Sequence, residues 1–481
     1  MMKKAELVFL PLSEIGHLLS MVELARRLID QDDRITITFI NTAAPFGSTT
    51  IGDIESLGNS LADTGICFIN LPHHHQPAAS QNSSLTVFIE NQKPHLINAI
   101  IQHATSESNS NPAQLAGFIV DFFWVSMIDV ANQLEVPTYM YFTSGAATLG
   151  VLLHLPTLHN EITTELKNYE GELSIPSFFN PVPPSVLPTL FLDNNTEAYA
   201  CFLYYSQRLK ETAGIIVNTF ADLECHAMNS FQDGQTPLVY PVGPLLNVCS
   251  GSNEAKHVKI MTWLDNQPPS SVIFLCFGSR GSFSESQVKE IAVGLEQSGH
   301  RFLWSLRRPS SAGNGHAYGS GSGSTSDFTN LEEVLPDGFL NRTKGRGLMC
   351  GWVPQTAILA HQAVGGFISH CGWNSILESL WNGVPVVVWP LYGEQKLNAF
   401  ELVREFRIGF DMGLTMRTDE GGVVTAKEVE AGVRLIMDGR HDSKEVRRVK
   451  EMREKSRMAV MDRGSSFYSL RQLVKDIMDR I

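Results

Sequence analysis

The sequence predicts an α/β fold with two consecutive doubly wound domains, each built on a parallel sheet with helices on both faces. Its 481 residues suffice for two large domains. Short apolar runs alternate with amphipathic segments, which is the pattern of repeated βαβ units. A Pro- and Gly-rich stretch at 240–253 interrupts this alternation, which then begins again. We therefore expect a first domain over 1–245, a linker over 246–258, a second domain over 259–460 and a final helix over 461–481 that packs back on the first domain.

Along the first half of the chain, strands are expected to end in short loops that lead into helices. The apolar run at 7–10 predicts a buried strand. A helix over 18–29 follows it, because Leu18, Val22 and Ala25 share one face. Further strands are predicted at 35–40, 65–70, 117–120 and 138–142, and further helices at 84–104 and 126–134.

The second half repeats this pattern. Ser284 and Gln287 have the spacing of a capping box, which predicts the start of a helix over 284–297. The Gly- and Ser-rich segment 311–328 has no core-forming pattern and predicts a surface loop. Strands are predicted at 271–277, 302–306, 348–350, 366–369 and 384–389, and helices at 356–360, 375–381, 394–405, from 425 onward and over 465–481.

Composition argues against several classes of protein. Charged residues make up 18% and hydrophobic residues 43%, which excludes a largely disordered chain. A net charge of −13 disfavours a nucleic-acid partner or an anionic membrane surface, since such partners require positive fields. The apolar run 7–12 is too short for a signal peptide. Pro137 and Pro156 interrupt the uncharged stretch 136–160, so we expect no stable membrane insertion.

Cysteine usage points to a compartment. The seven cysteines are scattered and include no C-x-x-C pair. This pattern is typical of reduced thiols and not of a disulfide framework or a zinc site. We expect a cytoplasmic protein, and a monomer.

Three polar residues directly follow predicted strands. His17 comes shortly after the first strand, Asp121 ends the strand at 117–120, and His370 ends the strand at 366–369. Ligands of open α/β sheets bind at these carboxyl ends. The alternative for each residue alone is a loop position or a helix cap. Two such residues in one domain and one in the other favour a shared cleft.

The segment Gly372–Ser375 has the features of an anion site. A glycine turn at a helix start leaves unpaired N–H groups, and the helix dipole favours negative charge there. The alternative is structural, because Ser375 and Glu378 have capping-box spacing. Ser279, after the strand at 271–277, offers a second phosphate contact. The chain contains neither a P-loop motif nor a complete G-x-G-x-x-G, so standard ATP or dinucleotide binding is not predicted.

A long motif supplies the context for these residues. It runs from Trp352 to Gln395 and reads WVPQTAILAHQAVGGFISHCGWNSILESLWNGVPVVVWPLYGEQ. This stretch resembles, almost position for position, the signature box of plant family 1 UDP-dependent glycosyltransferases. Further matches are TSGA at 143–146 and FGSRGSF at 277–283. The resemblance covers the whole chain and implies the GT-B fold, in which two Rossmann-like domains with parallel sheets face a central cleft.

The resemblance also implies a donor site. Trp352 would stack on the uracil, since an aromatic plane is a good platform for a base. Gln355 would lie beside uracil and ribose, and Glu378 would accept hydrogen bonds from the ribose hydroxyls. The diphosphate would be held by Ser279, His370, Asn374 and Ser375. Four residues would lie near the sugar, namely Trp373 by its backbone, Glu394, Gln395 and Thr143, and Val353 completes the donor-binding set.

The resemblance implies that His17 is the general base and Asp121 its partner. A histidine can take a hydroxyl proton at neutral pH, and a carboxylate behind it stabilises the imidazolium. The resulting attack opposite the UDP group would invert the anomeric configuration. Ser13 and Glu14 stand where small residues are common in the family, and Gly393 where alanine is frequent.

We therefore expect an inverting UDP-glucose-dependent O-glucosyltransferase whose acceptor is a small apolar molecule such as a flavonoid, another phenolic or a terpenoid. Gln395 favours glucose, whereas a histidine there tends to accompany galactose in the family. Acceptor contacts are predicted for Phe88, Phe122, Tyr392 and Gly393, with core packing as an equal alternative for the aromatic residues. Two other functions stay open: a nucleotide-sugar epimerase of the same fold, and a catalytically silent protein that binds UDP-sugar or hydrophobic ligands.

No metal or other cofactor is expected besides the UDP-glucose co-substrate. Asp30 and Asp32 match the D-x-D pattern of metal-dependent glycosyltransferases, but they lie between a helix and the next strand, at the wrong end of the sheet. A solvated turn is the better interpretation. The run His73–His75 lies in a Pro-flanked loop without a partner cluster.

Overall fold

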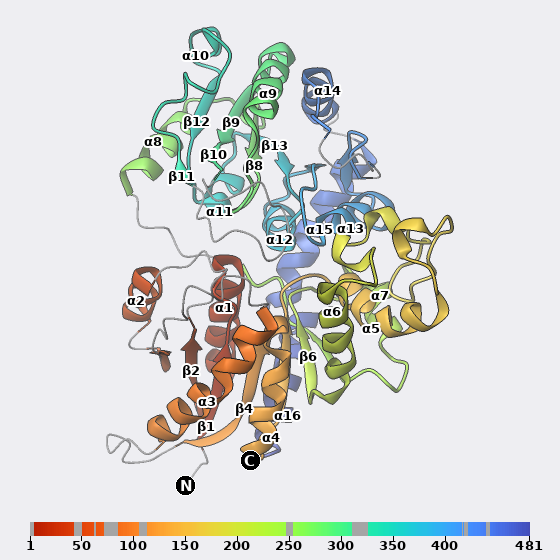
Figure 1. Ribbon diagram of the computed structural model, residues 1–481. Helices are drawn as coiled ribbons and strands as arrows, with labels where there is room; N and C mark the ends of the chain where they lie inside the picture. Colours follow the sequence, from red (N-terminus) through yellow and green to blue (C-terminus); the bar gives the residue numbers. More distant parts are fainter. Residues whose placement is uncertain are drawn as a thin grey trace.

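The computed structural model describes residues 4–42, 51–61, 64–71, 85–104, 113–246, 254–309, 326–415, 417, 422–438 and 443–481. Two domains, each with a large parallel sheet, lie one above the other (Figure 1). This is the α/β architecture predicted from the alternation of apolar runs and amphipathic segments. Parallel sheets need cover on both faces, which explains why so many of the strands are apolar throughout.

The first domain contains a seven-stranded sheet in the order β3-β2-β1-β4-β5-β6-β7. Its strand order reverses between β1 and β4, which pair in parallel. The strands are β1 (Ala5–Leu10), β2 (Ile35–Asn41), β3 (Ile66–Asn70), β4 (Gln114–Asp121), β5 (Thr138–Phe142), β6 (Gly214–Val217) and β7 (Val239–Pro241). The helices are α1 (Ile15–Gln31), α2 (Ile51–Ser60), α3 (Leu85–Ala104), α4 (Ile128–Gln133), α5 (Ala146–Glu161), α6 (Glu197–Arg208) and α7 (Cys225–Ser230). Short 3₁₀ turns occur at Phe122–Met127, Leu166–Asn168, Pro184–Val186, Thr189–Phe191 and Leu209–Glu211.

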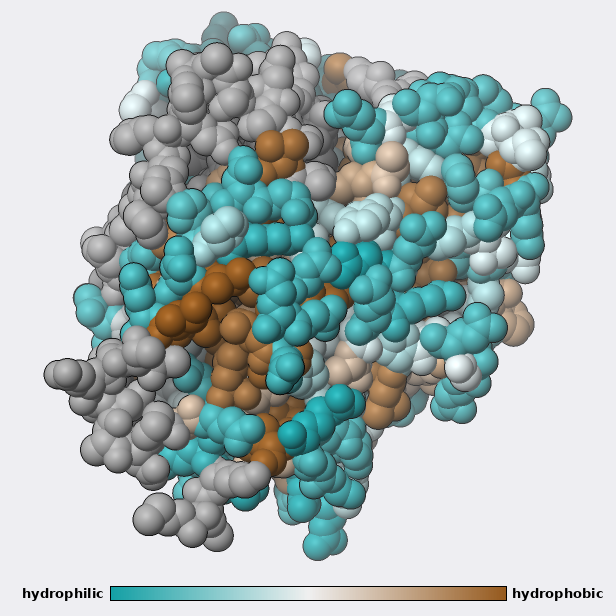
Figure 2. Space-filling model, turned by 60° about the horizontal axis from the view of Figure 1, so that its bottom comes forward, coloured by the Kyte–Doolittle hydropathy of each residue, from teal (hydrophilic) through white to brown (hydrophobic). Residues whose placement is uncertain are grey.

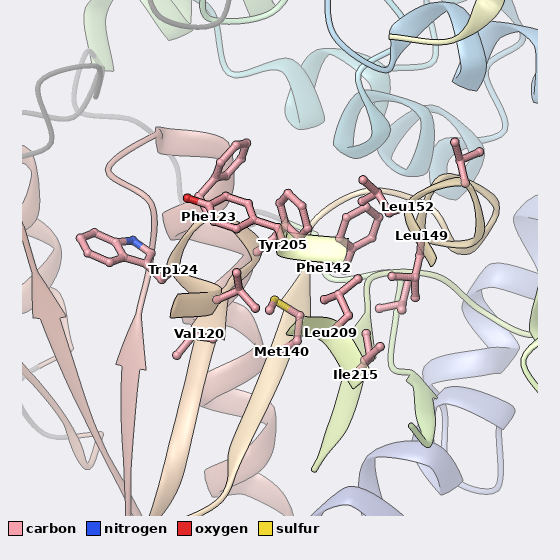
Figure 3. Packing of buried hydrophobic residues seen from close by; sticks show 14 of the residues in the cluster. Val120, Phe123, Trp124, Met140, Phe142, Leu149, Leu152, Tyr205, Leu209 and Ile215 are labelled. Carbon is pink, nitrogen blue, oxygen red and sulfur yellow. The ribbon is translucent and has the colours of Figure 1, made fainter. Parts of the chain in front are cut away.

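One face of this sheet carries an extensive apolar core. Val120 of β4, Met140 and Phe142 of β5, and Ile215 of β6 point to the same side (Figure 3). They meet side chains of α5 and α6. On the other face, α1 packs on the sheet through Leu18, Met21, Leu24, Ala25 and Leu28.

The second domain contains a six-stranded sheet in the order β12-β9-β8-β13-β14-β15. Its order reverses between β8 and β13. The strands are β8 (Val272–Cys276), β9 (Arg301–Ser305), β12 (Gly347–Cys350), β13 (Val364–Ser369), β14 (Val386–Val388) and β15 (Gly409–Asp411). The helices are α8 (Glu254–Asp265), α9 (Glu285–Ser298), α10 (Phe339–Arg342), α11 (Gln355–Leu359), α12 (Trp373–Asn382), α13 (Gln395–Phe400), which continues as a π-helix over Glu401–Glu405, α14 (Ala426–Met437) and α15 (Lys444–Val460).

Helix α16 (Ser465–Met478) belongs to the core of the first domain, although it follows the second domain along the chain (Figure 1). Leu470, Leu473 and Ile477 are buried there. The hydroxyl of Tyr240, on β7, donates a hydrogen bond to Asp476 Oδ2 at 2.6 Å. The predicted return of the last helix to the first domain is thus present, while the exact domain boundaries stay a prediction.

Two local predictions differ from the structure. Ser284 caps α9 as expected, but the Gln287 side chain pairs with the backbone of Val424 and does not complete a capping box. The segment 311–328 lies outside the described residues except for its end. There Ser326–Asp327 forms a short strand, β11, antiparallel to β10 (Arg307–Arg308), so these residues are not loop.

The surface turned forward in Figure 2 is largely hydrophilic, with one larger hydrophobic area left of the centre and single hydrophobic residues elsewhere. Scattered apolar side chains are normal on the surface of a folded protein. Within the described part of the chain, we find no helix that combines the length and the apolar character needed to span a bilayer.

Candidate active site

His17 and Asp121 meet at the reversal of strand order in the first domain. His17 lies in the first turn of α1, and Asp121 is the last residue of β4. Because β1 and β4 are neighbours, the loops that follow them are adjacent. His17 Nδ1 lies 2.6 Å from Asp121 Oδ2, so the two residues form the pair that the sequence predicts.

The surroundings of this pair favour a proton-accepting histidine. Asp121 is fully buried, and its Oδ1 accepts a hydrogen bond from the backbone N–H of Phe123 at 3.1 Å. Burial lowers the pKa of His17, but the charge and hydrogen bond of Asp121, with smaller effects of Glu14 and Glu394, raise it above its ordinary value overall. Thr143 Oγ1 lies 3.4 Å from the same ring nitrogen. With Nδ1–H donating to Asp121, Nε2 is the nitrogen that can take a proton.

His370 and the start of α12 occupy the corresponding place in the second domain. A Cβ atom at Gly278 or Gly372 would lie 2.6 or 2.5 Å from His370 Nε2, so the imidazole requires glycine on both sides. Gly278 also adopts φ +75°, which favours glycine. Burial lowers the pKa of His370 to about 4, although the Cys276 carbonyl opposes this. His370 is therefore neutral at pH 7 and could offer a phosphate a hydrogen bond but no full charge.

Helix α12 begins at Trp373, with Gly372 as its N-cap. The capping box at Ser375 and Glu378 is therefore wrong, because Ser375 already lies inside the helix. Ser375 Oγ instead accepts a hydrogen bond from Gln355 Nε2 at 2.8 Å. The first turn of a ten-residue helix leaves backbone N–H groups without intrahelical partners, as an anion site requires.

Glu378 and Gln355 lie together beside this helix. Gln355 Nε2 donates to Glu378 Oε2 at 2.8 Å. Burial raises the pKa of Glu378 to about 7, while hydrogen bonds from Gln355 and Thr356 oppose the shift. Nearby, Val353 is buried, but the Trp352 side chain is 45% exposed. The backbone N–H of Trp352 donates to Asp327 Oδ1 at 3.0 Å, which fixes the main chain at this residue.

Gln395 has a role that the sequence did not reveal. Its Oε1 accepts hydrogen bonds from the N–H groups of Leu391 and Tyr392, at 2.9 and 3.0 Å. Only its NH₂ group therefore faces other partners. Burial raises the pKa of the neighbouring Glu394, opposed by the charge of His17. Gly393 adopts φ +63°, which explains glycine at this turn.

Two predicted donor residues of α12 bridge the domains. The Trp373 side chain is buried, and its Nε1 donates to the carbonyl oxygen of Asn218 at 2.7 Å. Asn374 Nδ2 donates to the carbonyl oxygen of Gly16 at 3.1 Å. Asn218 is not predicted from the sequence, because it follows β6, a four-residue strand with too short an apolar run to be recognised.

For the remaining predicted residues, the structure gives burial and packing but does not distinguish a binding role from a structural one. Ser279 is partly buried in the loop after β8. Phe122 is only 3% exposed, and its ring packs edge-on against the rings of Phe142 and Tyr205 in the core. Phe88 is buried beside Trp124. Burial raises the pKa of Tyr392 to about 12. Core packing thus accounts for Phe88 and Phe122, and their contact with an acceptor stays a prediction.

The metal-like motifs do not form a site in the described part of the chain. Asp32 pairs with Arg34 at 2.6 Å, beyond the end of α1 and away from His17. His73–His75 lies outside the described residues. The described residues include no group of three or more His, Cys, Asp or Glu side chains placed to bind a metal ion.

Comparisons with known proteins agree with this geometry. Residues 238–465 match the family model described as UDP-glucoronosyl and UDP-glucosyl transferase. UDP-glycosyltransferase 71A15 of Malus domestica is 46% identical, with 99% of this chain and 100% of that protein covered. UDP-glucose flavonoid 3-O-glucosyltransferase 6 of Fragaria ananassa is 44% identical, with 99% of each chain covered. The crystal structure of Medicago truncatula UGT71G1 complexed with UDP-glucose matches with a TM-score of 0.85 and 39% identity, covering 99% of this chain and 98% of that one.

These similarities extend over nearly the whole chain and include both domains around the cleft. The fold is GT-B, as the resemblance of the signature box implied. Epimerase and silent-binding functions lose their support, because the relatives are named as transferases. The chain belongs to the plant family 1 UDP-glycosyltransferases, and it is an enzyme of the hexosyltransferase class.

Proposed function

We propose that this enzyme is an inverting UDP-glucose-dependent O-glucosyltransferase with His17 as general base and a small apolar phenol or terpenoid alcohol as acceptor. The observation that carries the proposal is the 2.6 Å contact between His17 Nδ1 and buried Asp121. It assigns the proton of the neutral ring to Nδ1 and leaves Nε2 basic. A base positioned in this way contributes about 10²–10⁴ to a rate.

The reaction runs in one displacement. Nε2 of His17 takes the acceptor's O–H proton while the oxygen forms a bond to the anomeric carbon of glucose. The bond between that carbon and the UDP oxygen breaks, and UDP leaves from the opposite face. Asp121 then stabilises the imidazolium, as a carboxylate does in a serine-hydrolase triad. The α-configured donor thus gives a β-glucoside.

The leaving diphosphate would be stabilised by hydrogen bonds and the dipole of α12. Its first-turn N–H groups, together with Ser279, Ser375 and His370, supply donors. The Asn374 side chain already bonds Gly16, so its second N–H is the one available for phosphate. On this basis we propose that catalysis requires no metal.

The sugar would be recognised by Glu394 and Gln395. Gln395 offers two N–H donors and Glu394 offers carboxylate acceptors, which together suit adjacent equatorial hydroxyls. For the acceptor, the name of the Fragaria ananassa relative supports a flavonoid or a similar phenolic.

The test is incubation of the enzyme with UDP-glucose and a panel of flavonoids, simple phenols and triterpenols, followed by mass spectrometry and by NMR of the anomeric proton. We expect β-O-glucosides, and a loss of about 10²–10⁴ in turnover for His17→Ala with UDP affinity nearly unchanged. An α-product, or near-normal turnover of His17→Ala, would contradict the mechanism.

A further inference from the structure

We propose that Asn218 is a positioning residue for the transfer, because its side chain fixes the orientation of Asn374 and so holds the start of α12 against the turn that carries His17. This inference rests on the proposed function, in which the acceptor is deprotonated by His17 and the diphosphate is bound at α12. Asn218 contacts neither substrate in this mechanism. It would act through Asn374 and Gly16.

The amide of Asn218 can satisfy its neighbours in only one orientation. The residue is fully buried at the end of β6. Its Oδ1 accepts a hydrogen bond from the backbone N–H of Leu245 at 2.7 Å. If the amide were reversed, its NH₂ would face that N–H and leave two buried donors without an acceptor, at a cost of about 1–3 kcal/mol.

The orientation of the Asn218 amide determines the orientation of the Asn374 amide. Asn218 Nδ2 donates to Asn374 Oδ1 at 3.3 Å. Asn374 must therefore present its NH₂ on the other side, where Nδ2 donates to the carbonyl oxygen of Gly16 at 3.1 Å. A directional chain of hydrogen bonds thus runs from Leu245 through Asn218 and Asn374 to Gly16.

Two members of this chain, Gly16 and Asn374, lie next to the groups proposed to take part in the reaction. Gly16 immediately precedes His17, and its carbonyl also accepts a hydrogen bond from Ser20 at 3.0 Å. Asn374 lies in the first turn of α12, where the diphosphate is proposed to bind. The carbonyl oxygen of Asn218 holds the adjacent Trp373 indole at 2.7 Å. Asn218 therefore fixes the distance between base and leaving group, and an error of about 1 Å there can cost about 10²-fold in rate.

A second contact between the domains provides a matched control. Thr148 Oγ1, on α5, donates to Asn398 Oδ1, on α13, at 3.3 Å. Both side chains are buried, as Asn218 is. Their side-chain hydrogen bonds go to each other and, from Asn398 Nδ2, to the carbonyl oxygen of Cys371, and not to His17 or Asn374. Thr148→Val thus removes one buried hydrogen bond between the domains without touching the chain through Gly16.

The experiment compares Asn218→Asp, Asn218→Ser, Thr148→Val, Asn374→Ala and the double variant Asn218→Asp/Asn374→Ala. A carboxylate at 218 still accepts from Leu245 but repels Asn374 Oδ1, whereas serine is too short to reach Asn374. We expect kcat to fall about 10–100-fold in both Asn218 variants, with the Kd of UDP, measured by calorimetry, changed little. The kcat of Thr148→Val should stay close to that of the wild type. In the double variant, Asn218→Asp should cause almost no further loss of kcat beyond that of Asn374→Ala alone.

The proposal is overturned if the Asn218 variants lose no more kcat than Thr148→Val, or if the losses of Asn218→Asp and Asn374→Ala multiply fully in the double variant. It is also overturned if neither Asn218 variant folds, since Asn218 would then serve stability alone. A wild-type enzyme that binds UDP but glucosylates no acceptor in the panel would instead contradict the proposed function.

Discussion

Glu14 and Arg280 form an ion pair across the cleft, with 2.8 Å between Glu14 Oε1 and Arg280 Nη2. Glu14 is the N-cap of α1, the helix that carries His17, and Arg280 follows Ser279 in the loop after β8. Glu14 stands where small residues are common in the family. The structure gives it a partner in the other domain, beside the predicted diphosphate site.

Replacing Glu14 should shift the pH dependence of transfer. Glu14 raises the pKa of His17, so Glu14→Gln lowers this pKa and lets the basic form persist to lower pH. The acid limb of the kcat/KM profile should move to lower pH, measured with UDP-glucose and a phenolic acceptor. Glu285→Gln, which alters an exposed pair with Lys289, is the control and should leave the limb in place. An unchanged limb in Glu14→Gln would mean that Glu14 does not influence the base.

Asp121→Asn should lower turnover and move the acid limb of the pH profile to lower pH by more than Glu14→Gln does. Asp121 supplies the two largest influences that raise the pKa of His17, and the opposing effect of burial would remain. The pKa therefore falls, while the imidazolium formed in the transition state loses its counter-charge. We expect kcat to fall about 10²–10³-fold, measured between pH 5 and pH 9. A limb that moves to higher pH would contradict this account.

Chelation should leave activity largely unchanged. The proposed diphosphate site consists of the N–H groups of α12 and neutral donors, including His370, whose pKa near 4 keeps it uncharged. The measurement is initial rate after dialysis against EDTA, with and without added Mg²⁺ or Mn²⁺. Activity that disappears on dialysis and returns with either metal would place the diphosphate elsewhere.

Gln395→His should weaken the preference for UDP-glucose. Polar groups left unpaired by the epimer cost about 1–3 kcal/mol each, which predicts a preference of roughly 10–100-fold over UDP-galactose in the wild type. A neutral imidazole has one acceptor nitrogen, so it cannot hold both Leu391 and Tyr392 as Gln395 Oε1 does. We expect the kcat/KM ratio of the two donors to narrow, with kcat lower for both and the Kd of UDP nearly constant. A large increase in the Kd of UDP would show that Gln395 does not act on the sugar.

Glu401→Gln should stabilise the protein at high pH. Burial, followed by the charge and hydrogen bond of Glu224 and the charge of Glu405, raises the pKa of Glu401 well above 4.5. The folded state thus keeps a proton that the unfolded state releases, so stability falls as pH rises from the unfolded to the folded pKa, by at most about 1.4 kcal/mol per pH unit. Glutamine mimics the protonated acid, so the Tm advantage of Glu401→Gln should grow between pH 5.5 and pH 8.5. Glu285→Gln should show no such trend.

Much of the fold followed from local pattern. The strand predicted at 138–142 has the bounds of β5, and His17 and Asp121 were found because each follows an apolar strand. Strands β6, β7 and β15 were not predicted, because three or four residues give only a weak periodic signal, although β12 and β14 are equally short and were predicted from their apolar runs. The capping box at Ser375 failed because its spacing also fits a helix that begins two residues earlier.

The roles of Asn218, Gln395 and Arg280 depend on tertiary contacts. Asn218 bonds a residue 156 positions away, and no local window contains both partners. The Oε1 of Gln395 is used by its own loop, which depends on the left-handed turn at Gly393. The Glu14–Arg280 pair exists only when the two domains are assembled.

The return of α16 to the first domain has a consequence for biosynthesis. Leu470, Leu473 and Ile477 complete the core beside α1, yet they follow the second domain in the sequence, so the ribosome adds them after it. When the first domain emerges, one apolar stripe of its sheet lacks its native cover until the entire second domain has been translated. Large chains usually fold domain by domain during translation. In this protein the first domain cannot complete its folding before the second domain has been translated. Nascent chains stalled before residue 465 will therefore expose this apolar stripe. A holdase chaperone should bind them in preference to chains that include α16.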